Sequence, residues 1–312
     1  MKYYIGIDLG GTNIVAGVVD ENYKIISKAS TKTNLPRPEK EIAADMARVS
    51  VQAVKEAGLD MNQIEWVGIG TPGIANSEKG IIEYSCNLGF DNTPMVDYIK
   101  EYIDKPVFIE NDANAAAYGE YVAGAAKGAK NAVCITLGTG VGGGIIADGR
   151  ILSGATGAAG EIGHIHVMDG ETERCNCGNY GCLEQYTSAT GIVRLAKRRL
   201  AKDDKPSTLR NHQEISAKTV FDAVKEGDEL AVEVAEQFGE ILGKALADIA
   251  GVVNPEIFVI GGGVSKAGPI LLDFIQKNYT PYVFAGSRGA LFALATLGND
   301  AGIYGAAKMV LD

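Results

Sequence analysis

The sequence is poor in the features that mark membrane and nucleic-acid-binding proteins. No uninterrupted apolar run approaches the roughly 18–20 residues that a membrane span needs. Lysine and arginine together number 29 against 39 aspartates and glutamates, so the formal net charge is −10. An acidic chain without a basic stripe binds nucleic acid and anionic lipid poorly, so neither nucleic acid nor a membrane is expected as a partner.

A secretion signal is also missing from residues 1–20. The segment "MKYYIGIDLGGTNIVAGVVD" is apolar but broken by Asp8 and Gly10-Gly11, and it has no small-residue cleavage site. These absences predict a cytoplasmic protein. The chain has only five cysteines, an odd number, and a reducing compartment disfavours disulfides. Cysteines that cluster in such a protein are more often metal ligands or catalytic groups.

Glycine and apolar residues are plentiful. Hydrophobic residues make up 46% of the 312 residues, and the 40 glycines lie in short clusters rather than in a repeat. This length and composition fit two domains or one large α/β unit. Two β-branched runs flank Gly10-Gly11-Thr12 and predict strand, tight turn, strand. Helices are expected over residues 39–57, 93–103, 111–126, 187–200, 216–226, 228–252, 267–278 and 300–311.

The strand–turn–strand pattern returns in "NAVCITLGTGVGGGIIADGRIL", which indicates two α/β halves of similar core. We expect a smaller domain over residues 1–117 and a larger one over residues 118–297. The larger domain would carry the cysteine-rich loop 164–184, and the C-terminal helix within 298–312 would pack on the smaller domain.

The glycine turns are candidate phosphate sites. Gly138, Gly140 and Gly143 match the dinucleotide fingerprint in spacing, but that fingerprint needs a helix directly after it, and the residues here predict a strand. No G-x-x-x-x-G-K-[ST] loop occurs. A glycine turn between strands can still bind phosphate through its backbone N–H groups. Two such turns, each with a threonine (Thr12 and Thr139), strengthen this interpretation.

Asp8 precedes the first turn at the end of its strand. Its carboxylate could hold Mg²⁺ directly or through water, and the alternative is a carboxylate that caps the turn. A third glycine loop, "VIGGGVS", also follows a predicted strand. It could lie against a nucleoside or be an ordinary connection from strand to helix.

One cluster has the residue types of a metal site. His164, Cys175, Cys177 and Cys182 combine into a Cys3His set, which is an established structural zinc set. C-x-C is less usual than C-x-x-C, so free surface thiols are the alternative. His166 is the rival fourth ligand, and a structural or packing role is expected for it instead.

Asn111 and Asp112 stand where the alanine-rich helix "ANAAAYGEYVAGAA" begins. The helix dipole and free N–H groups at that end favour an ionised carboxylate, which is the form a general base needs. The alternative is a helix N-cap, since aspartate is a common cap. The residues alone leave these two interpretations open.

The motifs "GIDLGGT", "TPG", "ENDANAAAYGE", "LGTGVGGG", "GAAGEIGHI" and "CNCGNYGCLE" occur in this order. Together they resemble the ROK family of sugar kinases and repressors, over nearly the whole chain, and most closely its glucokinase branch. The resemblance implies a two-domain α/β fold of the actin-like ATPase (ribonuclease H-like) class, with a catalytic cleft between the domains and a zinc-bound loop.

The resemblance also implies roles for particular residues. Asp112 would be the general base that takes the proton from the sugar's 6-hydroxyl. Sugar hydroxyls would be bound by Asn87, Asn111, Asp112, Glu161, His164 and Glu184. The ATP phosphates and adenosine would be held by Asp8, Gly10, Gly11, Thr12, Asn13, the turn 138–144 with Gly138, Thr139 and Gly140, and by Gly261, Gly262 and Gly263. Structural zinc would be bound by His164, Cys175, Cys177 and Cys182.

The implied activity is ATP-dependent and Mg²⁺-dependent phosphorylation of a hexose, with glucose as the expected substrate. N-acetylglucosamine, N-acetylmannosamine, allose and fructose are the alternative sugars, and polyphosphate is the alternative donor. A sugar-sensing repressor is disfavoured, because such proteins carry an N-terminal helix-turn-helix and the first phosphate-loop strand is expected here from residue 3. Family resemblance also implies a homodimer or homotetramer.

Overall fold

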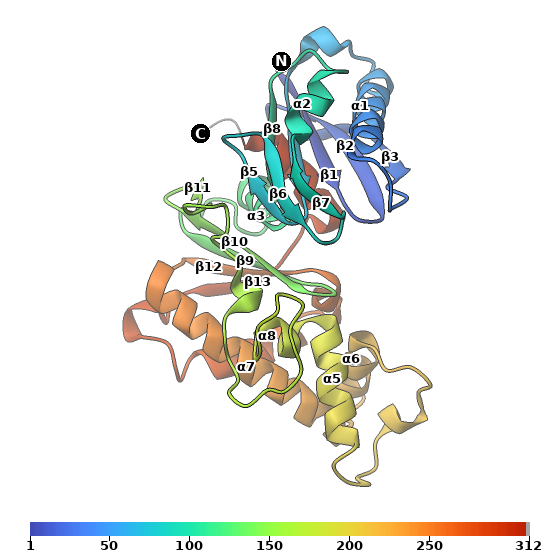
Figure 1. Cartoon of the computed structure of the whole chain (residues 1–312). Helices are drawn as coiled ribbons and strands as arrows, with labels where there is room; N and C mark the ends of the chain where they lie inside the picture. Colours follow the sequence, from blue (N-terminus) through green and yellow to red (C-terminus); the bar gives the residue numbers. More distant parts are fainter. Residues whose placement is uncertain (310–312) are drawn as a thin grey trace. The chain divides into compact units, whose positions relative to one another are not determined.

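The computed structural model describes residues 1–309, which form two compact units (Figure 1). Unit 1 comprises residues 1–129, 144–160 and the described residues from Leu297 onward. Unit 2 comprises residues 130–143 and 161–296. The boundary expected near Ala117 falls inside helix α3 (Asp112–Ala123), all of which belongs to unit 1.

Unit 1 contains a five-stranded sheet with the order β3-β2-β1-β4-β8. Its strands are β1 (Tyr3–Leu9), β2 (Asn13–Asp20), β3 (Ile25–Lys32), β4 (Ile64–Thr71) and β8 (Val107–Asn111). β1, β2 and β3 form an antiparallel meander, whereas β1, β4 and β8 run parallel. The carboxyl ends of parallel strands meet at one edge of a sheet. Asp8, at register with Gly70, and Asn111, at register with Thr71, therefore lie at the same edge.

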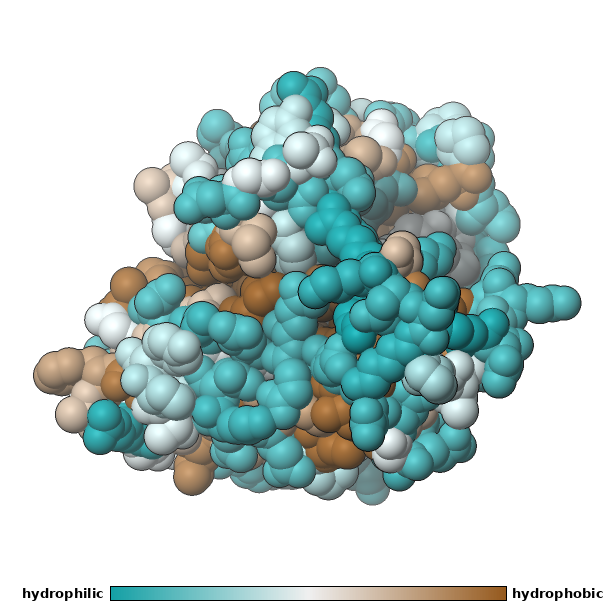
Figure 2. Space-filling view, turned by 90° about the horizontal axis from the view of Figure 1, so that it is seen from below, coloured by the Kyte–Doolittle hydropathy of each residue, from teal (hydrophilic) through white to brown (hydrophobic). Residues whose placement is uncertain are grey.

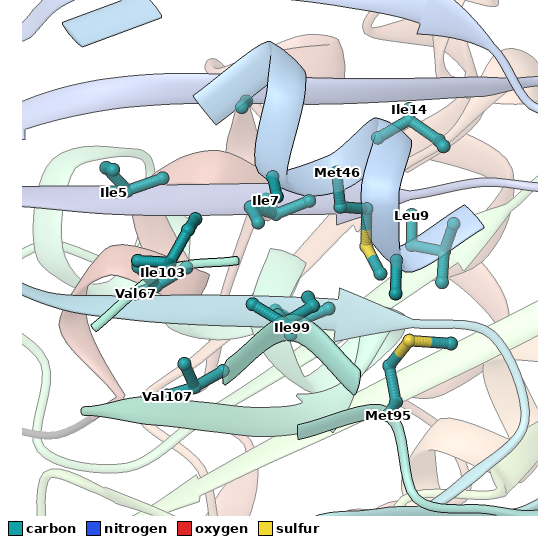
Figure 3. Close-up of a cluster of buried hydrophobic side chains, with 14 of the residues drawn as sticks. Ile5, Ile7, Leu9, Ile14, Met46, Val67, Met95, Ile99, Ile103 and Val107 are labelled. Carbon is teal, nitrogen blue, oxygen red and sulfur yellow. The ribbon is translucent and has the colours of Figure 1, made fainter. Parts of the chain in front are cut away.

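Alternation along β1 explains how both faces of this sheet are covered. Ile5, Ile7 and Leu9 belong to the core shared with α1 (Glu39–Glu56) and α2 (Met95–Lys100), which is drawn in Figure 3. Tyr4, one residue out of phase, packs with Ile303 of α9 (Ala301–Lys308).

The C-terminal helix α9 lies very close to the sheet. A Cβ atom at Gly6 or Gly68 would collide with the backbone of α9, so glycine is required at both positions. The Trp66 indole donates a hydrogen bond of 2.9 Å to the Ala307 carbonyl. The helix was expected to continue to residue 311, and residues 310 and 311 lie outside the described part of the chain.

A small antiparallel sheet in unit 1 was not predicted. It consists of β5 (Ile74–Asn76), β6 (Ile81–Ser85) and β7 (Phe90–Thr93). These strands are only three to five residues long. Strands this short have no clear alternation of apolar and polar residues, which is the main sequence signal for a strand.

The second sheet has the order β11-β10-β9-β12-β13. Its strands are β9 (Ala132–Leu137), β10 (Val141–Ala147), β11 (Arg150–Ile151), β12 (Ile257–Gly261) and β13 (Leu291–Leu294). β9, β12 and β13 run parallel, so the turn after β9 and the loop after β12 meet at one edge of unit 2. β13 was not predicted, because its four residues are flanked by irregular chain.

The helices of unit 2 agree with the predicted pattern, except the first and shortest of them, which was not predicted. They are α4 (Glu184–Thr187), α5 (Ala189–Leu200), α6 (Ala217–Lys225), α7 (Glu229–Val253) and α8 (Ile270–Tyr279). Side chains of Ser188, Ser216 and Asp228 cap α5, α6 and α7 by accepting backbone N–H groups. The 3-10 helices of both units are η1 (Met61–Gln63), η2 (Ile162–His164), η3 (Thr208–Asn211), η4 (Gly263–Ala267), η5 (Ala285–Ser287) and η6 (Gly298–Asp300).

On the face that Figure 2 shows, hydrophilic residues predominate and hydrophobic residues lie scattered among them. Among residues 1–309, no helix has the length and apolar character needed to cross a membrane.

Candidate active site and metal centre

The first glycine turn joins β1 to β2 in unit 1. The Gly10 carbonyl accepts a 2.6 Å hydrogen bond from the Thr33 hydroxyl, and the Thr12 carbonyl accepts one of 2.9 Å from the Thr33 amide. In a trans peptide the C=O and the following N–H point in opposite directions. The N–H groups of Gly11 and Asn13 therefore point away from Thr33, as amides that bind an anion must.

Asp8 lies beside this turn, under the beginning of α9. A Cβ atom on Gly302 would stand 3.2 Å from the Asp8 carboxyl carbon, so α9 covers the carboxylate closely. Burial, and then the negative charge of Asp112, raise the pKa of Asp8 to about 6. Two carboxylates thus share the carboxyl edge of this sheet, and their mutual repulsion would be relieved by a cation.

Asp112 is the first residue of α3, and Asn111 is its N-cap. The Asn111 side-chain oxygen accepts hydrogen bonds from the amides of Ala113 (2.8 Å) and Asn114 (3.1 Å). The Asn111 amide nitrogen donates to the Gly73 carbonyl at 2.9 Å. Asn111 therefore takes the N-cap role that was the alternative for Asp112. One Asp112 oxygen also accepts a hydrogen bond of 2.8 Å from the Ala113 amide.

Asn87 lies in the exposed turn between β6 and β7. Its carbonyl oxygen would stand 3.9 Å from a Cβ atom placed on Gly11, so this turn is a neighbour of the first glycine turn. Unit 1 thus brings together Asp8, Asn87, Asn111 and Asp112 with the Gly10–Asn13 turn.

The second glycine turn joins β9 to β10 and is held in the same way. The Gly138 carbonyl accepts a 2.8 Å hydrogen bond from the Ala189 amide, and the Thr139 carbonyl accepts one of 2.9 Å from the Thr190 hydroxyl. By the same peptide geometry, the N–H groups of Thr139 and Gly140 point away from this anchor. The turn leads into strand β10, so the helix required by a dinucleotide fingerprint is absent.

The third glycine loop follows β12, next to the second turn. Gly262 has φ of +82°, and a Cβ atom there would stand 2.5 Å from the Leu137 carbonyl oxygen, so only glycine fits. The register of β12 pairs Gly261 with Thr136 of β9. The predicted phosphate and adenosine loops of unit 2 therefore lie side by side at one sheet edge.

The four predicted zinc ligands converge in unit 2. The ligand atoms of His164, Cys175, Cys177 and Cys182 all lie within 4.8 Å of one another. The Cys177 and Cys182 sulfurs are 3.6 Å apart, and the Cys175 sulfur is 3.7 Å from His164 Nδ1. Four ligands around tetrahedral zinc stand roughly 3.6–3.8 Å apart, so these spacings fit that ion. A disulfide would need about 2.05 Å between sulfurs.

The loop around these ligands is tightly turned. Cys175 and Asn179 share a backbone hydrogen bond of 2.8 Å, and Gly178 has φ of +92°. Burial first, and then hydrogen bonding with the neighbouring cysteine thiols, raise the pKa of Cys182 to about 12. A group of thiols that resists ionisation alone is a donor set that a divalent cation would convert to thiolates.

His166 is turned away from the cluster. Its Nδ1 lies 2.9 Å from the Tyr180 carbonyl oxygen and its Nε2 lies 3.0 Å from an Asp169 carboxylate oxygen. Both ring nitrogens are thus occupied by oxygen atoms, which agrees with the structural role expected for this residue. The hydrogen bond with Asp169 is the largest cause of the raised pKa of His166.

The predicted sugar ligands of unit 2 border the thiol cluster. A Glu161 carboxylate oxygen lies 3.9 Å from His164 Nε2, on the side of the ring opposite the thiols. One oxygen of Glu184 accepts a 2.9 Å hydrogen bond from the Val141 amide, and the other lies 3.7 Å from the Cys175 sulfur. Glu184 therefore connects the cysteine loop to the second glycine turn.

Sequence reasoning missed an ion-pair cluster that anchors the tip of the cysteine loop. The Glu171 side chain is 2% exposed and lies 2.9 Å from Arg194 and 3.0 Å from Arg198, both on α5. The Tyr186 hydroxyl also donates to it. These partners, Arg198 above all, hold the pKa of Glu171 well below its usual range. Arg194 and Arg198 are four residues apart on one helix face, which was the available signal.

Two units of α/β structure, each with an anchored glycine turn at a sheet edge, define a protein of the actin-like ATPase class, and the predicted fold class is confirmed. The chain matches the ROK family over residues 4–312. It is 40% identical over 314 residues to a glucokinase of Halalkalibacterium halodurans, covering 99% of this chain and 95% of the relative. It is 37% identical over 311 residues to a glucokinase of Thermotoga maritima, covering 98% and 96%.

The similarity to glucokinases extends to a solved structure. The ROK family glucokinase from Streptomyces griseus, in complex with glucose and AMPPNP, is 36% identical with a TM-score of 0.80, covering 98% of each chain. The chain belongs to the ROK family. The resemblance drawn from its sequence motifs is confirmed.

Proposed function

We propose that this ROK protein, an ATP-dependent sugar kinase, is a glucokinase that converts glucose and ATP to glucose 6-phosphate and ADP. The observation that carries the proposal is the pairing of Asp8 and Asp112 at one sheet edge, beside the first glycine turn. The full-length similarity to glucokinases supports glucose as the sugar.

Asp112 acts as the general base in this proposal. It takes the proton from the 6-hydroxyl of glucose as that oxygen attacks the γ-phosphorus of ATP, and the bond from phosphorus to the ADP oxygen breaks. Phosphoryl transfer depends mainly on positioning and charge stabilisation, so the base contributes alongside the phosphate loops. The N-terminus of α3 favours the ionised carboxylate that a base requires.

The remaining site residues bind glucose, ATP or Mg²⁺ in this proposal. Glucose hydroxyls are bound by Asn87, Asn111, Glu161, His164 and Glu184. The outward amides of the two glycine turns bind the ATP phosphates, and the Gly261–Gly263 loop lies against the adenosine. Asp8 would hold Mg²⁺ directly or through water, and a bound ion would neutralise phosphate charge.

Zinc has a structural role in this proposal. His164, Cys175, Cys177 and Cys182 are its ligands, and the chemistry of this set suits tetrahedral zinc. Glu161 and Glu184 border the ligands, so a bound ion would fix their positions. Assembly into a homodimer or homotetramer is part of the proposal as the family resemblance implies it.

Removal of the base tests the proposal most directly. Asp112→Ala should lower kcat by at least about a thousandfold, since base and orientation are lost together, while glucose binding measured by calorimetry persists. Near-normal kcat in a folded Asp112→Ala protein would sink the assignment of the base.

Substrate choice needs a separate assay. ADP release should be measured with glucose, N-acetylglucosamine, N-acetylmannosamine, allose and fructose, with and without Mg²⁺, and with ATP or polyphosphate as donor. The highest kcat/KM is expected for glucose with Mg²⁺ and ATP. A higher value for another sugar or for polyphosphate would replace the corresponding part of the proposal and leave the kinase intact.

A further inference from the structure

A buried glutamate stands directly behind the proposed base. Glu110 is the second-last residue of β8, is 8% exposed, and lies two positions before Asp112. Four hydrogen-bond donors converge on its carboxylate. They are the Asn111 amide (2.9 Å), the Asn114 side-chain amide (3.1 Å), the Ser77 hydroxyl (3.3 Å) and the Ser153 hydroxyl (3.2 Å). An ionised carboxylate offers about four acceptor positions, so this set fills it.

The donors divide between the two carboxylate oxygens. One oxygen takes both bonds from α3, namely the amide of its N-cap and the side chain of Asn114 one turn later. The other oxygen takes the hydroxyls of Ser77, in the turn after β5, and Ser153, in the segment after β11. Glu110 therefore ties the beginning of the helix that carries Asp112 to two separate loops of unit 1.

Stability does not explain this arrangement well. All four groups that contact the carboxylate in the described chain are neutral, so the buried charge has no cation beside it. Burying a charge without a partner ion is costly, and a packed apolar side chain would usually stabilise such a position more. A carboxylate is favoured here because it orients several donors at once.

Ser153 begins a segment that connects the hydrogen bonds of Glu110 to the proposed sugar site. Residues 153–160 lead along the chain into Glu161, a proposed sugar ligand. Gly157 in this segment packs on β5, where a Cβ atom would stand 2.7 Å from the Ala75 carbonyl oxygen. The segment is thus fixed against the same small sheet that carries Ser77.

We propose that Glu110 is a positioning residue of the kinase: through its four hydrogen bonds it fixes Asp112 relative to the Ser153 segment. The inference rests on the proposed role of Asp112 as base. Glu110 touches no reacting atom, and it acts through the backbone of Asn111 and the first turn of α3. Loss of its hydrogen bonds lets the base move, and a displacement near 1 Å can cost about a hundredfold in rate.

The test compares Glu110, at the end of β8, with Glu120, a buried glutamate of α3. Glu120 is 3% exposed and accepts 2.8 Å hydrogen bonds from the amides of Ala125 and Leu297, at the opposite end of the helix. Glu110→Ala should lower kcat roughly 10- to 100-fold, with the glucose Kd within about threefold of wild type. Glu120→Ala should lower the Tm and leave kcat within about twofold.

Glu110→Gln separates hydrogen bonding from charge. Its amide oxygen can accept from Asn111 and Asn114, and its NH2 group can donate to the two serine hydroxyls. This variant should retain kcat within about fivefold, and Ser153→Ala should lower kcat by a few-fold with little change in Tm. If Glu110→Ala fails to fold, Glu110→Gln and Ser153→Ala provide the test instead.

Wild-type kcat in Glu110→Ala, or equal loss of kcat in Glu110→Ala and Glu120→Ala, would overturn the inference. So would a Glu110→Gln protein as impaired as Glu110→Ala. Asp112→Ala is measured in the same series to separate the two proposals. An inactive Asp112→Ala beside a fully active Glu110→Ala refutes only the role of Glu110, whereas an active Asp112→Ala refutes the proposed base.

Discussion

The two glycine turns have the same construction and different carboxylates. In each, a distant segment donates hydrogen bonds to two carbonyl oxygens of the turn. The donors are the hydroxyl and amide of Thr33 in unit 1, and the Ala189 amide and Thr190 hydroxyl in unit 2. The carboxylate beside the first turn, Asp8, is half-buried next to a second negative charge. The carboxylate beside the second turn, Glu184, receives the Val141 amide.

This difference indicates a division of roles between the units. Glu184 accepts a backbone amide and so fixes the cysteine loop to its turn, beside its proposed role in binding glucose. A carboxylate whose burial and neighbour oppose its charge is held at a cost in stability, which is typical of functional sites. We therefore expect unit 2 to depend on the zinc ligands for its stability and unit 1 to gain stability when its acidic pair is neutralised.

Loss of the metal set should give the largest effect, and it should fall on unit 2. Cys182→Ser, or treatment with a strong zinc chelator, should lower the midpoint of the unfolding transition of unit 2 by about 10 °C, since structural zinc contributes several kcal/mol. The transition of unit 1 should move little. Differential scanning calorimetry with elemental analysis measures both, with one zinc per chain expected before treatment.

The exposed thiol Cys86 provides the matched control, because it lies outside the cluster. Cys86→Ser should leave the zinc content and both transitions unchanged. The tip of the cysteine loop should remain docked on α5 after chelation, because the Glu171 ion pairs do not involve the metal ligands. An unfolding profile that chelation does not change would contradict a structural metal here.

The candidate site illustrates what sequence reasoning can reach. The glycine turns, the position of Asp112 at the start of a helix and the grouping of the Cys3His set were predictable, because local spacing and family motifs carry them. The residues that anchor the turns were not predictable. Thr33 and Thr190 lie 23 and 51 residues away in the sequence from the carbonyl groups that they bind, and a local pattern gives no signal for such contacts. Glu110 was part of a quoted motif, but its burial and its serine partners come only from the tertiary fold.

The fold shows the same limit. Most of the helices and the strands next to the glycine turns have clear patterns and were predicted, whereas β5, β6, β7 and β13 are too short to show alternation. The Ala117 boundary was placed from the repeat of the strand pattern. Unit 1 is discontinuous, because the described residues from Leu297 onward belong to it again. Such an arrangement arises from long-range packing, which a pattern along the sequence does not contain.

Neutralising the acidic pair should have the next largest effect. The pKa of Asp8 is about 6 in the folded protein against 3.8 as its ordinary value, so between these pH values the folded state binds more protons than the unfolded state. Stability from this group is therefore present below about pH 4 and is lost as the pH rises through about 6. Asp8→Asn should stabilise unit 1 by up to about 3 kcal/mol above pH 6 and by little at pH 4.

Urea unfolding of wild type and Asp8→Asn at several pH values measures this gain. Kinase activity should fall sharply in the same variant, because the proposed Mg²⁺ ligand is lost. Glu184→Gln is the comparison in unit 2, and it should destabilise at neutral pH because its charged hydrogen bond to Val141 is weakened. A stabilising Glu184→Gln, or an Asp8→Asn gain that is the same at pH 4 and pH 8, would contradict the division of roles.

The threonine anchors should give the smallest effects, and these should differ between the units. Thr33 is fully buried, so Thr33→Val leaves the Gly10 carbonyl without its hydroxyl partner and should cost about 1–3 kcal/mol. Thr190 is exposed, so water can replace its hydroxyl at Thr139, and Thr190→Val should cost at most about 0.5 kcal/mol. The same order is expected for the rise in KM for ATP, because only the buried anchor fixes its turn without help from water. Urea unfolding and steady-state kinetics on the two variants measure both quantities, and equal effects would mean that the turns are held by their backbone hydrogen bonds alone.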